Sequence, residues 1–300
     1  MRIAITGSTG LVGTALTRAF RKDGHEVTRI VRSYGGLAAS ERPVVWHPDE
    51  GVIDAQGLEG HDVVVHLAGE SLAGVWTDAK KRRIRASRVN GTGLLARTLA
   101  TLAKPPAVFI SASGFDFYGD RPRDEVLDEG SAPGTGYLPE VVQAWEDATE
   151  PAEGGPIRVV NTRFGNVLSP DGGMLATILP LFRLGLGAKF GDGLQLWPWI
   201  ALEEMTPAMY HVIATAELVG PVNFVAPDVV SNKEFTDALA AAIGRPSFLT
   251  VPAFAARLAP GGMSEELLLR GARVVPARLI DTGYEFLYPK LGVALRSMLK

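Results

Sequence analysis

Short apolar runs alternate with amphipathic stretches through the first half of the chain. Near-continuous runs rich in valine and isoleucine are typical of parallel strands that are buried on both faces. The expected strands are 3–6, 26–31, 44–47, 62–67, 107–111 and 157–162. The expected helices are 11–22, 77–103 and 138–150. This alternation predicts an α/β fold of the Rossmann type, in which a doubly wound parallel sheet is covered on both faces.

The rhythm changes after Asn166. Glycine, proline and aspartate interrupt the pattern at 169–173, at 184–193 and at Pro198, which predicts a loop-rich section. A strand near 222–226 is expected to return to the main sheet, and helices are expected at 232–243, 251–258, 264–270 and 291–299. We therefore expect a Rossmann domain over 1–168, completed by the returning strand, and a smaller, partly interleaved C-terminal substrate lobe over 169–300.

The composition narrows the class of protein. The chain has 300 residues, is 46% hydrophobic and carries a formal net charge of −3, so its charge gives no pull toward nucleic acid or an anionic membrane. It has no cysteine, which excludes disulfides and thiolate–metal sites, and its five histidines lack metal-ligand spacing. No apolar stretch approaches the length of a membrane span, and the first apolar run is too short for a signal peptide. We expect a cytoplasmic protein with no metal, no nucleic-acid partner and no membrane partner.

A glycine-rich turn follows the first strand and precedes the first helix. Gly7, Gly10 and Gly13 have the spacing GxxGxxG, in the context that a dinucleotide-binding turn requires. The first glycine permits the tight turn, the second lets the backbone approach a pyrophosphate, and the third lets the helix pack on the strand. Three glycines can also make a turn without any ligand, but the position and spacing favour nucleotide binding. The expected contacts are Gly7, Ser8, Thr9, Gly10, Leu11, Val12 and Gly13.

The end of the second strand indicates which nucleotide binds. Sites that prefer NAD place an acidic residue there to bind the ribose 2′-hydroxyl. This chain has Arg32 and Ser33 instead. A guanidinium can form a bidentate pair with a 2′-phosphate, so Arg32 favours NADP(H), although an ordinary exposed arginine is the alternative.

The run 6–13, together with 66–69, resembles the extended short-chain dehydrogenase/reductases. Further segments narrow the resemblance to an atypical branch, the NAD-dependent epimerase/dehydratase-like "epimerase family proteins" with a characteristic C-terminal domain. The matching segments are 67–70, 76–77, 87–88, 111–113, 145–146, 163–173, 199–200, 223–227, 271, 274–276, 283–286 and 288–289. The resemblance covers essentially the whole chain. It implies an NADP(H)-binding oxidoreductase or epimerase that acts on a small carbonyl compound or a sugar nucleotide.

The resemblance also implies roles for particular residues. Ser113 matches the serine that holds a substrate oxygen beside the nicotinamide, and Arg163 and Asn166 match a segment that lines the substrate side of the cleft. The residues expected to border the cofactor are Leu67, Ala68, Gly69, Glu70, Arg88 and Ser111.

The chain departs from the family pattern at its acid–base pair. Ordinary members need Tyr-x-x-x-Lys, in which the lysine ammonium lowers the pKa of the phenol. Depending on the alignment, Val141 or Val142 stands where the lysine belongs. Tyr118 and Asp116 are then the best remaining proton donors, while a packing role for Tyr118 is equally open. Two hypotheses follow: an enzyme with altered proton transfer, or a non-catalytic NADP(H)-binding sensor, in either case a monomer or a homodimer.

The basic run 80–88 is the densest on the chain. It suits a phosphorylated ligand or nucleic acid in principle, but the overall acidity and the lack of interleaved aromatic residues favour a solvated helix face. Arg88 stands apart from the rest of the run because the resemblance retains it.

Overall fold

A single eight-stranded sheet organises the chain in the computed structural model, which describes residues 1–35, 41–257, 263 and 265–300. The strand order is β12-β8-β6-β5-β1-β2-β3-β4. The strands are β1 (Arg2–Thr6), β2 (Glu26–Val31), β3 (Val44–His47), β4 (Val52–Ile53), β5 (Val63–His66), β6 (Val108–Gly114), β8 (Arg158–Phe164) and β12 (Gly220–Phe224). All of them pair in parallel except β4, which is antiparallel to β3. The predicted doubly wound parallel sheet is confirmed, with its order reversing between β1 and β5.

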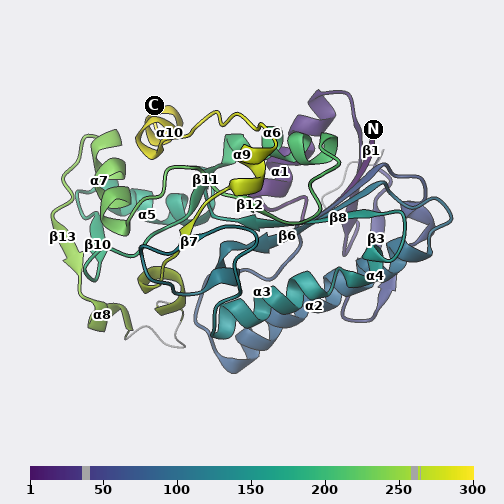
Figure 1. Cartoon of the computed structure of the whole chain (residues 1–300), viewed down its shortest axis with the longest axis horizontal. Coiled ribbons are helices and arrows are strands. Elements are labelled where there is room, and N and C mark those ends of the chain that lie inside the picture. The colour runs from purple at the N-terminus through teal and green to yellow at the C-terminus, as the bar shows by residue number, and fades with distance from the viewer. Residues whose placement is uncertain (36–40, 258–262, 264) are drawn as a thin grey trace.

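Helices cover both faces of this sheet (Figure 1). Successive strand residues point to opposite faces, so Ile3 and Ile5 pack with α1 (Leu11–Lys22) and α6 (Leu202–Ala214), whereas Ala4 packs on the other side with α2 (Asp78–Thr101). The α2 layer also includes α3 (Tyr137–Asp147) and the short α4 (Glu150–Glu153).

A third cluster of buried side chains forms the core of a smaller lobe, at the left of Figure 1. Its elements are α5 (Gly173–Arg183), β10 (Ala188–Phe190), α7 (Asn232–Ala242), β13 (Leu249–Val251), α8 (Ala253–Arg257), the π-helical turn η4 (Glu265–Leu269) and α10 (Leu291–Met298). The remaining short elements are η1 (Gln56–Leu58), η2 (Phe115–Tyr118), β7 (Val126–Leu127), β9 (Asn166–Leu168), β11 (Trp199–Ala201), β14 (Arg273–Val274) and α9 (Ala277–Asp281).

The prediction of a loop-rich section after Asn166 is wrong for two helices. Helix α5 contains Pro180 and α6 contains Pro207, and a proline inside a helix argues against that helix in the sequence. Both helices form because they bury apolar faces, and tertiary packing outweighs the local preference. Helix α6 packs against α1 on the main sheet, rather than in the smaller lobe where this section was expected.

Several other boundaries also differ from the predictions. The helix expected at 251–258 is strand β13 followed by α8, and residue 258 lies outside the described residues. The helix expected at 264–270 corresponds to η4, with residue 264 outside the description. In the part of the chain that is described, no helix has the length and apolarity needed to cross a membrane.

The start of α1 is held against the turn after β1 by a contact that only glycine permits. A Cβ atom at Gly13 would lie 2.2 Å from the carbonyl oxygen of Gly7, which is backbone and cannot rotate away. Gly154, in contrast, has open space around its Cβ position and an ordinary φ of −75°.

We expect Gly13→Ala to lower the free energy of unfolding by about 2–4 kcal/mol, because the helix and the turn must separate to admit the methyl group. Gly154→Ala is the matched control and should change it by less than about 0.5 kcal/mol. Urea denaturation of the two variants and the parent measures both values. Equal stability of all three proteins would show that the turn has room to adjust.

Candidate dinucleotide-binding site

The glycine turn presents the start of α1 to a ligand. Gly7 has a φ of +64°. The backbone N–H of Gly10 donates to the Gly7 carbonyl oxygen at 3.0 Å and closes the turn. Gly10 is the N-cap of α1 and provides no side chain to cap the helix. The first backbone N–H groups of α1 therefore point toward the turn, where the helix dipole favours an anion. This arrangement fits a pyrophosphate.

The hydroxyl of Thr6 joins the ends of β1 and β5. Its Oγ1 accepts hydrogen bonds from the backbone N–H groups of Leu67 at 2.9 Å and Ala68 at 3.1 Å, and lies 2.8 Å from Nδ1 of His66. Burial lowers the pKa of His66 to about 3, so the ring is neutral and Nδ1 accepts the Thr6 proton. Leu67 and Ala68 are thereby fixed beside the glycine turn, as expected of a segment that borders the cofactor.

Sequence reasoning missed both Thr6 and His66. A threonine that immediately precedes the glycine turn and a histidine inside an apolar strand were the available signals. They point to a bond between strand ends only once the two strands are known to be neighbours.

The end of β2 supplies positive charge. Arg32 and Ser33 are both exposed there, at the carboxyl edge of the sheet. A second cation, Arg29, was not predicted: its Nε donates to Ser8 Oγ at 2.9 Å and its guanidinium lies 3.6 Å from Glu41. Arg29 thus positions the second residue of the turn from the neighbouring strand.

The basic run 80–88 on α2 contacts the segment that follows the carboxyl end of β5. The Lys80 ammonium bonds Glu70 at 2.8 Å and, with Arg83, holds the pKa of that carboxyl below its usual range. Arg88 turns inward, where its Nη1 donates to the Glu70 carbonyl oxygen at 3.1 Å and its guanidinium lies 4.9 Å from the centre of the Trp145 ring. The run is therefore only partly the solvated face that its composition favoured.

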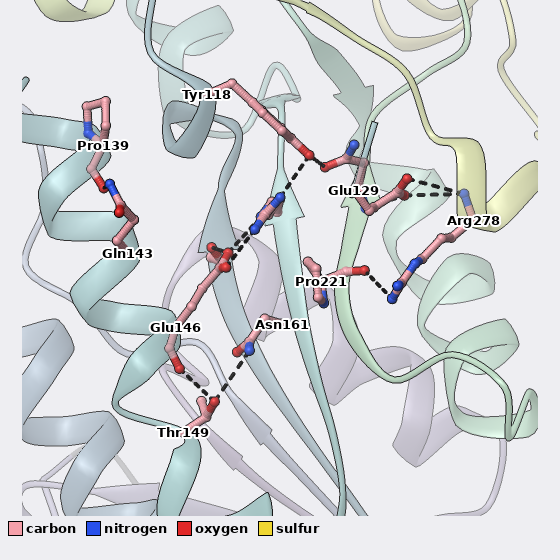
Figure 2. Close-up of polar contacts among 12 residues, drawn as sticks. Tyr118, Glu129, Pro139, Gln143, Glu146, Thr149, Asn161, Pro221 and Arg278 are labelled. Carbon is pink, nitrogen blue, oxygen red and sulfur yellow. Dashed lines mark hydrogen bonds and ion pairs between the residues drawn. The ribbon is translucent and has the colours of Figure 1, made fainter. Parts of the chain in front are cut away.

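A network of buried polar groups begins near the carboxyl end of β6, and Figure 2 shows its contacts. Ser113 Oγ donates to a Glu146 carboxylate oxygen at 2.5 Å. Arg163 donates to both oxygens of Glu146, each at 2.8 Å, and its Nη1 donates to the Tyr118 hydroxyl at 2.9 Å. The Tyr118 hydroxyl in turn donates to Asn223 Oδ1 at 2.8 Å.

This network, from Ser113 to Asn223, continues into the C-terminal part of the chain. Asn223 Nδ2 donates to the Val275 carbonyl oxygen at 2.9 Å, and its backbone N–H donates to Glu129 at 2.9 Å. The same Glu129 carboxylate accepts from the backbone N–H of Arg278 at 3.3 Å (Figure 2). Strand β12, helix α9 and the loop after β7 are therefore tied to the interior of the Rossmann sheet.

Both residues expected to act on a substrate are engaged in this network. Ser113 is 4% exposed and Tyr118 is fully buried. Burial raises the pKa of Tyr118 to about 12, against the lowering effect of Arg163. Their contacts indicate a structural task, and the catalytic roles expected for them stay predictions.

The other predicted residues are spread along the same edge of the sheet. Ser111 is buried within β6 and bonds the Ala112 carbonyl at 3.3 Å. Asn166 donates to the Pro198 carbonyl oxygen at 3.0 Å and so holds the segment leading to β11. No group of three or more histidine, aspartate or glutamate side chains suitable for a metal occurs among the described residues.

A doubly wound parallel sheet with a glycine turn at its switch point defines a Rossmann dinucleotide-binding protein. Residues 3–225 match the NAD dependent epimerase/dehydratase family, and residues 251–298 match a domain of unknown function, DUF1731. The chain belongs to this epimerase family. The predicted family membership is thereby confirmed, including the characteristic C-terminal domain.

Relatives resemble the chain over nearly its whole length. It is 42% identical over 294 residues to an epimerase family protein of Mycobacterium bovis, covering 98% of this chain and 96% of that protein. A crystal structure of the human epimerase family protein SDR39U1 with NADPH has a TM-score of 0.90 at 32% identity, with 99% of each chain covered. A nucleoside-diphosphate sugar epimerase from Corynebacterium glutamicum has a TM-score of 0.82 at 38% identity, covering 100% of this chain and 58% of that one.

We expect Glu146→Gln to lower the free energy of unfolding by about 3–5 kcal/mol, because it leaves the buried Arg163 cation without a counter-charge. Glu26→Gln is the control: Glu26 is 66% exposed and pairs with Arg2 at 3.6 Å, so its loss should cost under about 1 kcal/mol. Chemical denaturation of both variants tests the difference. Similar stabilities for the two variants would contradict the importance assigned to the buried pair.

Proposed function

We propose that the protein binds NADP(H) and catalyses hydride transfer to a small carbonyl compound or a sugar nucleotide. The observation that carries the proposal is the glycine turn at the start of α1, whose Gly10 N-cap leaves the helix terminus open to a pyrophosphate. The family membership supports a nicotinamide nucleotide in general. When bound, that nucleotide supplies the hydride chemistry, and the protein supplies binding, orientation and proton transfer.

The preference for NADP(H) over NAD(H) rests on charge at the end of β2. Arg32 stands where an acidic residue would select the 2′-hydroxyl, and its exposure leaves the guanidinium free to pair with a 2′-phosphate. Arg29 holds Ser8 in place from the neighbouring strand, while its own charge is paired with Glu41. The NADPH in the human relative supports the same choice.

We expect Arg32→Asp to weaken NADPH binding about ten- to a hundredfold, because a charge-assisted pair is replaced by repulsion, while NADH binding is spared or improved. Arg82→Asp makes the same charge change at an exposed position on α2 and should leave the ratio of the two affinities unaltered. Titration calorimetry measures the affinity of each variant for NADPH and for NADH, relative to the parent. If Arg32→Asp weakens both nucleotides equally, Arg32 does not select NADP(H).

The class of substrate is proposed from the relatives and from the position of the smaller lobe. Ligands of open α/β sheets bind beyond the carboxyl ends of the strands, and Arg163, Asn166 and the C-terminal segments lie around that edge. The nucleoside-diphosphate sugar epimerase among the solved structures supports a sugar nucleotide as one candidate. Aldehydes and ketones are the other candidate, because hydride transfer needs a carbonyl or a secondary alcohol.

We expect the purified protein to oxidise NADPH slowly with at least one member of a panel of aldehydes, quinones and nucleotide sugars. Partial loss of acid–base assistance, usually worth about 10²–10⁴ in rate, leaves a slow enzyme rather than an inactive one. Ser113→Ala should be slower with the best substrate while its NADPH affinity is unchanged. Absorbance of NADPH measures turnover, and a parental rate for Ser113→Ala would remove Ser113 from the proposed mechanism.

A second function, a non-catalytic NADP(H)-dependent sensor, is favoured by one observation. Val141 stands at one of the two alternative lysine positions and is buried in an apolar cluster with Trp76, Ile84 and Leu138. The alignment that uses this position therefore places no cation on α3. Tight NADPH binding without any NADPH consumption across the panel would support the sensor over the enzyme.

A further inference from the structure

We propose that Asp116, with Arg88 beside it, faces the nicotinamide end of the bound nucleotide and exchanges the proton that accompanies hydride transfer. This inference rests on the proposed function and names the residue that replaces the missing tyrosine–lysine pair. Arg88 comes from α2 and Asp116 from η2, so no residue of the usual pair takes part.

The two groups lie at the carboxyl ends of neighbouring strands. A Cβ atom at Gly69, just after β5, would lie 3.6 Å from Arg88 Cζ. A Cβ atom at Gly114, the last residue of β6, would lie 3.3 Å from Asp116 Oδ2. Strands β5 and β6 pair directly, which brings the guanidinium and the carboxylate to one stretch of the sheet edge.

This stretch belongs to the half of the sheet that takes the nicotinamide. A doubly wound sheet consists of two mononucleotide-binding halves, and the dinucleotide spans the point where the strand order reverses. The β1–β2 half carries the glycine turn and Arg32, which fit the pyrophosphate and the 2′-phosphate. The β5–β6 half is left for the second mononucleotide and the substrate that meets it.

Both side chains retain hydrogen-bonding capacity that the described residues do not use. Arg88 Nη1 donates to the carbonyl oxygens of Ile84 and Glu70, while its Nε and Nη2 have no acceptor among the described residues. The only hydrogen bond to the Asp116 carboxylate within that same part of the chain comes from its own backbone N–H, and Arg88 acts on it through space without a salt bridge there. A carbonyl or hydroxyl oxygen placed between them would accept from Arg88 and exchange a proton with Asp116.

The charges around Asp116 come from several elements. Arg88 on α2 attracts the ionised form and Glu266 on η4 repels it, but burial has the largest effect and raises the pKa of Asp116 to about 6. Glu70 and Tyr137 act on Arg88, and Arg270 and Lys81 act on Glu266. The Arg163 guanidinium lies over the ring of Phe117 on the same turn, but it is neutralised by Glu146. A carboxyl with a pKa near neutrality is suited to act as both acid and base.

The proposed step balances without a further reactant. In reduction, the Asp116 carboxyl gives its proton to the carbonyl oxygen as the carbonyl carbon receives a hydride from NADPH, and the resulting carboxylate regains a proton from solvent. Alcohol and NADP⁺ are the products. In the reverse direction the Asp116 carboxylate takes the hydroxyl proton while the hydride returns to NADP⁺. Reduction therefore slows, and oxidation accelerates, as the pH rises through the pKa of Asp116.

The test uses nucleotide binding, so it requires no known substrate. NADP⁺ carries a positive nicotinamide ring and NADPH a neutral one, so ionised Asp116 favours NADP⁺ alone. We expect the ratio of Kd for NADPH to Kd for NADP⁺ to rise on the order of tenfold between about pH 5 and about pH 8. The 2′-phosphate also titrates near pH 6, but it is common to both nucleotides and cancels in the ratio. Quenching of tryptophan fluorescence reports both affinities.

The variants separate Asp116 from its neighbours. Asp116→Asn should abolish the pH dependence of the ratio, and Asp116→Ser serves as a second charge-removing variant if the amide disturbs folding. Asp124→Asn, an exposed carboxylate eight residues further along, should keep the parental profile. Arg88→Gln should move the midpoint to higher pH and Arg88→Lys should retain it, whereas Glu266→Gln should move it to lower pH.

The outcomes distinguish this inference from the proposed function. A parental ratio that does not change with pH, or a dependence that survives removal of the Asp116 charge, overturns the role of Asp116 while leaving NADP(H) binding intact. A parental protein that binds neither nucleotide overturns the proposed function and, with it, the inference.

Discussion

The buried guanidinium of Arg163 is the constraint around which the polar interior is arranged. Its side chain is 3% exposed, and leaving such a buried charge unpaired costs about 3–5 kcal/mol. Glu146 provides the counter-charge, and the rings of Phe117 and Tyr118 lie 3.4 and 5.1 Å from the guanidinium carbon. Strand β8, helix α3 and turn η2 are thus fixed relative to one another by one cation.

The same constraint determines which polar groups remain for chemistry. Ser113 and Tyr118 donate to Glu146 and Asn223, so their hydroxyls complete the coordination of a structural ion pair. Buried polar groups that are fully paired make a core rigid, whereas groups left unpaired mark places where a ligand can contribute the missing partner. Asp116 and Arg88 keep part of their hydrogen-bonding capacity unused among the described residues, so we place the proposed chemistry there.

Local sequence patterns were sufficient for the parts of the fold that depend on local chemistry. The bounds of α1, β2 and β3 agree with the prediction because apolar runs, glycine turns and helix periodicity are properties of neighbouring residues. The directions of Ser113 and Tyr118 depend on partners 33 and 105 positions away, which no local pattern reveals. Helices α5 and α6 were missed for a related reason, since their stability comes from distant packing partners that compensate for an internal proline.

The absence of lysine from α3 has a spatial explanation. Tyr137, Val141 and Trp145 are spaced four residues apart and so share one face of the helix. Arg88 lies over Trp145, and its charge opposes the rise that burial causes in the pKa of Tyr137. The Arg88 guanidinium, from α2, therefore already lies against the α3 face that carries Val141. The surroundings of Val141 are apolar, so a lysine ammonium at that position would have no partner. The cation that faces this part of the sheet edge therefore comes from α2, where Arg88 lies beside Gly69 and Glu70 after β5, and the acid–base group we propose follows the neighbouring strand β6.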